Sequence, residues 1–166
     1  MKTMLKLFSL LCISLLISCG GKEDKKKESF SYEKKATTTQ KTAPEIKVTA
    51  SKKINLTDKG IGPITSVDLG SEINQAMVTQ GQGIYNKMCT ACHRPNKKFI
   101  GPAQAGIMER RTPEWIMNMI LNPEVMIQKD PLAKELLAEF NGAPMANQNL
   151  TQEEARAVLE YFRTLK

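Results

Sequence analysis

The sequence has very little histidine and cysteine, and its charge surplus lies outside the part expected to fold. His93 is the only histidine among 166 residues, and four residues are cysteine. The formal net charge of +7 comes from residues 1–53, because residues 54–166 contain twelve basic and twelve acidic residues. A folded part without net charge exerts no long-range attraction on nucleic acid. The sequence therefore predicts no nucleic-acid partner.

Long apolar runs and strand patterns are also missing. The apolar run at residues 7–17 is too short to span a bilayer. No convincing alternation of apolar and polar residues occurs, apart from a short extended stretch at residues 61–69. Hydrophobic residues make up 41% and charged residues 25% of the chain, which excludes wholesale disorder. The length allows one compact domain with additional segments.

The N-terminus has the layout of an export signal. Two lysines precede the apolar run, which ends in the sequence LISC with Cys19 as its last residue. This ending resembles the lipobox of bacterial lipoproteins, in which the signal is cut before an acylated cysteine. We predict a signal peptide at residues 1–18 and a lipid anchor at Cys19. The alternative is a plain signal peptide in which Cys19 is incidental. We expect an exported protein that is anchored to a membrane. The periplasmic side is the first expectation, and the cell surface is the alternative.

A lysine-rich stretch separates Cys19 from the folded part. Residues 20–53 contain ten lysines, five acidic residues and few apolar ones. Such a composition cannot bury enough apolar surface to offset chain entropy. We predict that residues 19–53 form a lipidated cysteine and a flexible tether, residues 54–72 a spacer or a strap over the head, and residues 73–166 the folded domain.

The motif C-x-x-C-H at Cys89, Cys92 and His93 indicates the chemistry. Two thiols three positions apart can each form a thioether with a haem vinyl group, and the adjacent imidazole then ligates the iron. A thioredoxin-like redox pair would need a βαβ setting, which the sequence lacks. A zinc site would need a fourth ligand, but the mature chain offers only one histidine and two thiols beyond Cys19. A disulfide between the two cysteines would close only a very short loop. We therefore predict one covalently bound haem c.

The single histidine also limits the second axial ligand. With His93 on one side of the iron, a second imidazole from this chain is impossible, so the sixth ligand is Met, another weak donor, water or nothing. Met145 lies in the sequence NGAPMAN, where Gly can end a helix and Pro stiffens a loop. We predict Met145, with Met126, in a short link after an Asn-Pro pair, as the alternative. Met117 and Met119 belong to a helical run and are interpreted as core residues.

Helical patterns account for most of the folded part. Apolar residues spaced by three and four predict a helix over residues 73–88 that leads into the motif. A cap residue followed by Pro predicts helix starts at Thr112 and Asp130, and a T-x-x-E capping box at Thr151 predicts a final helix. Gly81 lies on the apolar face of the first helix, where it would let another helix pack closely. The predicted fold class is all-α.

The region from about residue 73 to residue 166 resembles a class I cytochrome c. The resemblance rests on the motif G-x-x-x-Y-x-x-x-C-x-x-C-H at residues 81–93, followed by Gly-Pro at residues 101–102. A basic residue with Trp115, then Met145 after a Pro, and an aromatic C-terminal helix follow in the same order. The resemblance implies that the N- and C-terminal helices cross and that the haem lies in a helical pocket.

The resemblance also implies roles for individual residues. The carbonyl of Pro102 would accept a hydrogen bond from the proximal His93 and raise its donor strength. Arg111 and Trp115 would reach the haem propionates. In this family the first and last helices cross near the glycine, which implies that Gly81 faces Tyr161 or Phe162.

Three functions compete at this point. The first is a non-enzymatic electron carrier, because two firm axial ligands leave no iron position for a substrate. The second is a haem enzyme or gas-binding protein with an open sixth position, although the only histidine is already proximal. The third is a sensor or assembly lipoprotein with a structural haem. We predict the carrier.

The expected partners of a carrier are redox proteins. The chain resembles the small lipid-anchored monohaem cytochromes of respiratory and denitrification gene clusters. This resemblance implies that the electron passes from a membrane quinol oxidoreductase to a terminal oxidase or a nitrogen-oxide reductase, with nitrous-oxide reductase among the candidates.

Overall fold

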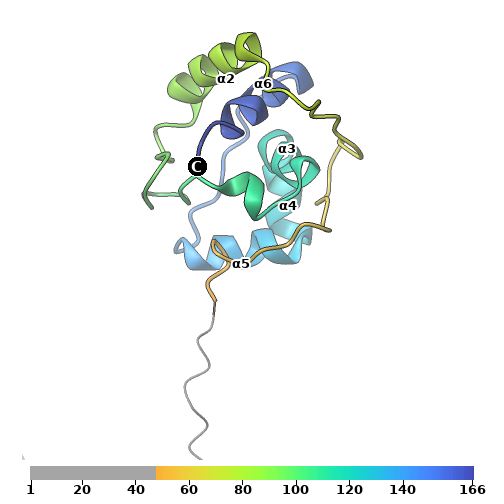
Figure 1. Cartoon of the computed structure of the whole chain (residues 1–166). Coiled ribbons are helices and arrows are strands. Elements are labelled where there is room, and N and C mark those ends of the chain that lie inside the picture. The colour runs from red at the N-terminus through yellow and green to blue at the C-terminus, as the bar shows by residue number, and fades with distance from the viewer. Residues whose placement is uncertain (1–47) are drawn as a thin grey trace, which may run out of the picture. The chain divides into compact units, whose positions relative to one another are not determined.

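The computed structural model describes residues 48–166, so the predicted signal peptide, Cys19 and the tether up to residue 47 lie outside the described residues. The described part is helical, and Figure 1 shows the helices arranged around a common centre. In chain order the elements are α2 (Gln75–Met88), the 3-10 helix η1 (Ile107–Glu109), α3 (Pro113–Leu121), α4 (Pro123–Lys129), α5 (Pro131–Glu139) and α6 (Gln152–Phe162). The all-α prediction is confirmed.

Three helix starts form by the capping contacts that the sequence predicts. The side chain of Thr112 accepts a hydrogen bond from the backbone N–H of Trp115 at 3.1 Å, which begins α3. Asp130 Oδ1 accepts from the backbone N–H of Ala133 at 2.7 Å, which begins α5. At α6 the capping box is complete, because Thr151 and Glu154 each accept from the other's backbone N–H. Each contact satisfies an N–H group that the helix itself leaves unpaired.

Two local predictions need correction. The first helix starts at Gln75 rather than residue 73, because Asn74 caps it by accepting from the backbone N–H of Met77 at 3.1 Å. The expected short link that holds Met126 is a helix, α4, with Pro at its first position. Residues 61–69 form no strand, and the one bridge found in residues 48–166 pairs Asn55 with Arg111.

Helices α2 and α6 cross at Gly81. A Cβ placed on Gly81 would lie 1.9 Å from the backbone oxygen of Ala157 and 2.8 Å from the backbone nitrogen of Val158. The two helices therefore touch backbone to backbone, which only a residue without a side chain permits. Crossing N- and C-terminal helices are confirmed, but the glycine faces Ala157 rather than Tyr161 or Phe162.

The aromatic residues of α6 pack one turn further along α2, on Tyr85. The Tyr85 ring lies 5.4 Å from the Tyr161 ring and 5.8 Å from the Phe162 ring, measured between centroids. The contact with Phe162 is edge to face, a geometry that aromatic pairs favour. All three side chains are buried. This cluster fixes the end of α2 from which the C-x-x-C-H motif continues.

A buried carboxylate joins α6 to the start of α2. Glu160 is fully buried and accepts hydrogen bonds from Arg156 at 2.5 Å, from Arg163 at 2.7 Å and from the backbone N–H of Asn74 at 2.8 Å. Burial alone would raise the pKa of Glu160, but these three donors together lower it below its ordinary value. The charged form is therefore the one that the fold stabilises.

The N-terminal segment, residues 48–72, has no regular structure and lies along the helices (orange to yellow-green in Figure 1). Asn118 of α3 holds it at two points, donating to the carbonyls of Lys59 and Ile64 at 2.9 Å each. The sequence predicts a flexible tether up to residue 53, whereas Ser51 hydrogen-bonds through both its N–H and its hydroxyl to Glu139 of α5. Residues 48–53 therefore belong to the packed part.

In the part of the chain that the structure describes, no helix combines the length and the apolar character needed to cross a membrane.

Candidate functional site

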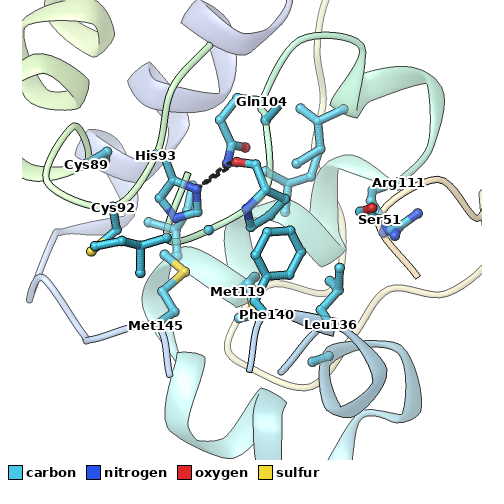
Figure 2. Close-up of a pocket in the computed structure, with 18 of the residues that line it drawn as sticks. Ser51, Cys89, Cys92, His93, Gln104, Arg111, Met119, Leu136, Phe140 and Met145 are labelled. Atoms are coloured by element: carbon cyan, nitrogen blue, oxygen red, sulfur yellow. Dashed lines mark hydrogen bonds between the residues drawn. The ribbon is translucent and has the colours of Figure 1, made fainter. Parts of the chain in front are cut away.

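The motif follows directly on the end of α2. The backbone N–H of Cys89 still bonds to the carbonyl of Tyr85 at 2.9 Å, and the N–H of His93 bonds to the carbonyl of Cys89 at 2.9 Å. This helical turn brings Cys89, Cys92 and His93 to the wall of one pocket, where Figure 2 shows them together. The two cysteines are not joined to each other. Both thiols therefore stay available for bonds to another group.

The two thiols differ in their surroundings. Cys89 is partly buried, and this burial, with a smaller contribution from Cys92, raises its pKa to about 11. Cys92 is exposed. Because the thiolate is the nucleophilic form of cysteine, a thiol that burial keeps protonated is a weak nucleophile. One thiol therefore lies deep in the pocket and the other at its mouth.

His93 is held through one ring nitrogen. Its Nδ1 lies 3.0 Å from the carbonyl oxygen of Pro102 and 2.8 Å from the side-chain nitrogen of Gln104. Burial lowers the pKa of His93, and the Pro102 contact partly opposes this effect. The neutral ring is the form that ligates a metal. Because Nδ1 is engaged, the nitrogen left for a ligand bond is Nε2.

Gly101 makes room for this arrangement. A Cβ at Gly101 would lie 2.5 Å from Cε1 and 2.8 Å from Nδ1 of His93. The backbone N–H of Gly101 donates to the carbonyl of Cys92 at 2.8 Å, which keeps the loop pressed against the imidazole. The Gly-Pro pair that the sequence singles out thus acts as a cradle for the ring.

Of the methionines in residues 48–166, two line the pocket: Met145 and Met119. Met145 comes from the loop between α5 and α6, and Figure 2 shows its sulfur directed toward His93. Met119 lies on α3 and packs against the hydrophobic core, as predicted, and it also lines the pocket. Met126 does not line the pocket; it is fully buried in α4, and its sulfur accepts from the backbone N–H of Ile61 at 3.0 Å.

Arg111 forms the far end of the pocket and carries a buried charge. Its guanidinium donates to the carbonyls of Ala50 at 2.7 Å, Arg110 at 2.8 Å and Lys53. No carboxylate of residues 48–166 forms a salt bridge with it. Burial lowers the pKa of Arg111. A cation whose hydrogen bonds go only to carbonyl groups is well placed to receive an anionic group in the pocket.

Trp115 also lines the pocket, beside Arg111. The guanidinium lies 5.3 Å from the centroid of its ring, within cation–π range. The indole N–H donates to Asp130 Oδ1 at 3.3 Å. This hydrogen bond already uses the polar group of Trp115, so contact with a haem propionate stays a prediction for Trp115, as it does for Arg111.

Two polar residues of the pocket were not predicted as site residues from the sequence. Tyr85 is buried, and its hydroxyl has no hydrogen-bond partner in the described residues. Burial, with a contribution from Cys89, raises the pKa of Tyr85 to about 12. Gln104 is buried beside His93. Tyr85 appears in the sequence motif only as an aromatic, and nothing in the sequence around Gln104 distinguishes it from an ordinary loop residue.

The lining of the pocket fits a haem in its chemistry. Aliphatic and aromatic side chains form most of the walls, and the pocket opens to solvent at its mouth. The thiols of Cys89 and Cys92 and the imidazole of His93 line one wall. The sulfur of Met145 lies on another wall, and the buried guanidinium of Arg111 lies at the far end. The buried hydroxyl of Tyr85 has no hydrogen-bond partner in the described residues, which a packed apolar core would not leave unsatisfied. The guanidinium of Arg111 bonds to carbonyl groups but has no carboxylate partner there.

Comparison with known proteins agrees with this geometry. The family model described as "Cytochrome c" matches residues 78–166. A cytochrome c2 of Rhodocyclus tenuis is 35% identical over 81 residues, covering 48% of this chain and 85% of that protein.

Solved structures show the same similarity. A cytochrome c from Rhodothermus marinus is 47% identical and superposes with a TM-score of 0.60, covering 61% of this chain and 87% of its own. An engineered form of that cytochrome, bound to a carbene intermediate, is 46% identical with a TM-score of 0.57, covering 61% of this chain and 88% of its own.

Proposed function

Since this chain belongs to the cytochrome c family, whose members bind one covalent haem c and carry electrons, we propose that its pocket holds the haem between His93 and Met145. Cys89 and Cys92 would form the two thioether bonds. One observation supports the proposal most directly. His93, with its Nδ1 bonded to Pro102, and Met145 line the same apolar pocket, and the sulfur of Met145 is directed toward His93. The bound haem supplies a one-electron couple between ferrous and ferric iron.

The residues of the chain make this couple suitable for electron transfer. Ligation by His93 and Met145 leaves no position at the iron for a substrate. The apolar walls exclude water, and a soft sulfur ligand favours the ferrous form, which raises the reduction potential. Arg111, with Trp115 beside it, would meet the haem propionates and offset their charge.

The mouth of the pocket is where an electron would leave. Cys92 is exposed there, and Ile100, which lines the pocket, is 48% exposed. Its neighbour Phe99 is 46% exposed and lies under the guanidinium of Arg94, 4.2 Å from the ring centroid. An apolar rim of this kind suits brief contact with a redox partner.

The carrier proposal predicts the behaviour of the reduced protein. The haem-loaded full chain should show a low-spin, six-coordinate spectrum that carbon monoxide does not change within minutes, because both axial positions are occupied. The measurement is an absorption spectrum before and after addition of carbon monoxide. Rapid carbon monoxide binding by the unmodified protein would instead support the haem enzyme or gas-binding function.

We propose further that the protein is an exported lipoprotein that stays at the membrane. The support is the signal-like N-terminus and the LISC sequence, which lie outside the described residues. In that place it would pass electrons from a quinol oxidoreductase to a terminal oxidase or a nitrogen-oxide reductase, nitrous-oxide reductase included. The periplasmic side is the first expectation and the cell surface the second.

The lipid anchor is tested by Cys19→Ala. We expect the variant to leave the membrane fraction, or to remain unprocessed, while the haem spectrum of any folded protein is unchanged, because Cys19 lies outside the haem domain. Fractionation followed by haem staining measures this. Cys12→Ala is the matched control, since Cys12 lies in the predicted signal peptide. A Cys19→Ala protein that is processed and stays in the membrane pellet would place the anchor elsewhere.

A further inference from the structure

The N-terminal segment carries three large aliphatic side chains that face solvent. Val48 is 52% exposed, Ile54 is 70% exposed and Leu56 is 55% exposed. The same segment buries Ala50 and Ile64 in the hydrophobic core. Folding of the domain therefore uses the inward side chains of the segment. It leaves Val48, Ile54 and Leu56, here called the apolar patch, at the surface.

The backbone that carries the apolar patch is held in place. Ser51 hydrogen-bonds through its N–H and its hydroxyl to Glu139 of α5, at 2.8 and 2.6 Å. Asn55 donates its N–H to the carbonyl of Arg110 at 2.9 Å. Figure 1 shows this start of the segment, in orange, beside α5. A partner of the apolar patch would therefore meet a preformed surface and would not have to order it first.

The apolar patch is continuous with apolar side chains of α5. Val48 and Ile54 line one open groove together with Pro131 and Leu132. Leu56 follows two positions after Ile54 and extends the exposed apolar surface along the segment. Single exposed apolar residues are ordinary on a protein surface, but a group of them marks an interaction surface.

Lysines accompany the apolar patch. Residues 48–61 contain three lysines and one acidic residue, namely Lys52, Lys53, Lys59 and Asp58. Lys52 is exposed, and Lys53 forms an exposed ion pair with Glu135 at the edge of the groove. Exposed ion pairs of this kind contribute little, so a phosphate group can replace the carboxylate. Exposed aliphatic side chains flanked by lysines suit a surface of anionic headgroups above an apolar interior.

The chain reaches the membrane from the same place. Val48 directly follows the predicted tether, residues 20–47, which would span about 30 Å as a flexible coil from the predicted anchor at Cys19. A surface held within such a distance is met at an effective concentration in the millimolar range, so even weak docking is populated. A second copy of the chain or a soluble protein has no such advantage. The bilayer is therefore the occupant that the charge and the attachment point favour.

We propose that the apolar patch docks on the membrane surface, with Ile54 and Leu56 among anionic phospholipid headgroups and the neighbouring lysines beside the phosphates. The proposal rests on the proposed lipid anchor, because the anchor keeps the bilayer within reach. The segment pairs through Asn55 with Arg111, at the far end of the pocket. Docking there leaves the mouth of the pocket at Cys92 uncovered, so a redox partner can reach it.

The test uses a chain that acyl groups cannot hold. Residues 20–166, exported behind an ordinary cleavable signal peptide and loaded with haem, keep the tether and the whole folded domain. The probe is vesicles of phosphatidylethanolamine and phosphatidylglycerol at millimolar lipid and low salt, and co-sedimentation gives the partition coefficient. We expect Ile54→Ser to lower this coefficient about threefold to tenfold, because serine loses the apolar area that enters the membrane surface. The haem spectrum should not change, because the Ile54 side chain is exposed.

Ile73→Ser is the matched control. Ile73 is also exposed, but it lies just before the start of α2 and outside the apolar patch. This variant should leave the partition coefficient unchanged. The tether lysines are the same in all three chains, so their attraction to the vesicles cancels in the comparison. Equal partition of Ile54→Ser and the unsubstituted chain would show that the tether alone attracts the vesicles, and it would overturn the proposal.

The lipidated protein tests docking at the anchored position. In vesicles of the same composition, Lys52 should be acetylated about twofold to threefold faster in Ile54→Ser than in the unsubstituted protein, because docking shields its amine. Lys87 on α2 is exposed and should react at the same rate in both proteins. Mass spectrometry measures both rates. Equal rates at Lys52 would contradict the proposal even if the unlipidated chain binds vesicles.

Self-association is the competing use of this surface. Analytical ultracentrifugation of the unlipidated chain should show a monomer. A dimer that Ile54→Ser dissolves, without vesicle binding, would assign the surface to a second copy and overturn the proposal. Docking is weak without the anchor, so Cys19→Ala should still leave the membrane fraction on dilution. A failure of that release would refute the proposed anchor, whereas the vesicle comparison tests the apolar patch, so the two failures are distinguishable.

Discussion

Met145→Ala should lower the reduction potential on the order of 0.1–0.3 V, within the roughly 0.8 V range over which axial ligands tune haem. The variant loses the sulfur that favours ferrous iron, so the ferric state gains stability. It should also bind carbon monoxide rapidly when reduced, because the sixth position is vacated. The weak long-wavelength absorption band typical of iron bound to thioether sulfur should disappear from the oxidised protein. Potentiometry and absorption spectroscopy measure all three effects.

Met119→Leu is the matched control for this prediction. Met119 is the other methionine that lines the pocket within residues 48–166, but it lies on α3 instead of a loop. Its replacement should leave the thioether band in place and change the potential little. Loss of the band in Met119→Leu, with retention in Met145→Ala, would transfer the ligand role to α3. Met126 needs no such test at the iron, because it does not line the pocket.

Gly81→Ala should destabilise the folded protein by about 3 kcal/mol or more. The new Cβ would meet the backbone oxygen of Ala157 at 1.9 Å, and backbone cannot rotate away as a side chain can. Helices α2 and α6 would have to separate, which also opens the aromatic cluster at Tyr85. We expect the apparent melting temperature of the haem-loaded protein to fall by roughly 10–20 °C. Thermal unfolding followed by circular dichroism measures it.

Gly83→Ala is the control on the same helix. A Cβ at Gly83 would have no neighbour within 4 Å, so the substitution adds no clash. Alanine is the better helix former and should stabilise the protein by about 0.5–1 kcal/mol. Opposite signs for two identical substitutions two residues apart would confirm that packing decides the cost at Gly81. Similar losses at both positions would show that the helices do not meet as described.

The sequence predicts those features that depend on neighbours in the chain. The caps at Thr112, Asp130 and Thr151 form between residues three apart, and each is found in the structure. The C-x-x-C-H motif likewise needs only one helical turn to bring its side chains together. Helix α4 was missed because seven residues give too short a pattern to read, and its Pro at the first position suggested a link.

Features that depend on distant neighbours could not be predicted in the same way. The sequence shows that Gly81 has no side chain, but not that the backbone of Ala157 fills the space. Gln104 gains its place from the Gly-Pro loop that folds back on His93, and a loop glutamine has no pattern of its own. The spacing of Met119 predicts a core residue, but it does not show that this part of the core also lines the pocket.

The contacts of the N-terminal segment (residues 48–72) bear on the order of folding. Its hydrogen bonds join residues far apart in the chain: 54 positions between Ile64 and Asn118, 65 between Ile61 and Met126, and 88 between Ser51 and Glu139. Closing such long loops lowers the chain entropy before any contact stabilises the closed state, so we expect these contacts to form late. Ser51 is also part of the pocket wall. We therefore expect this wall to close after the helices have formed, which leaves an entrance for the haem until the final step.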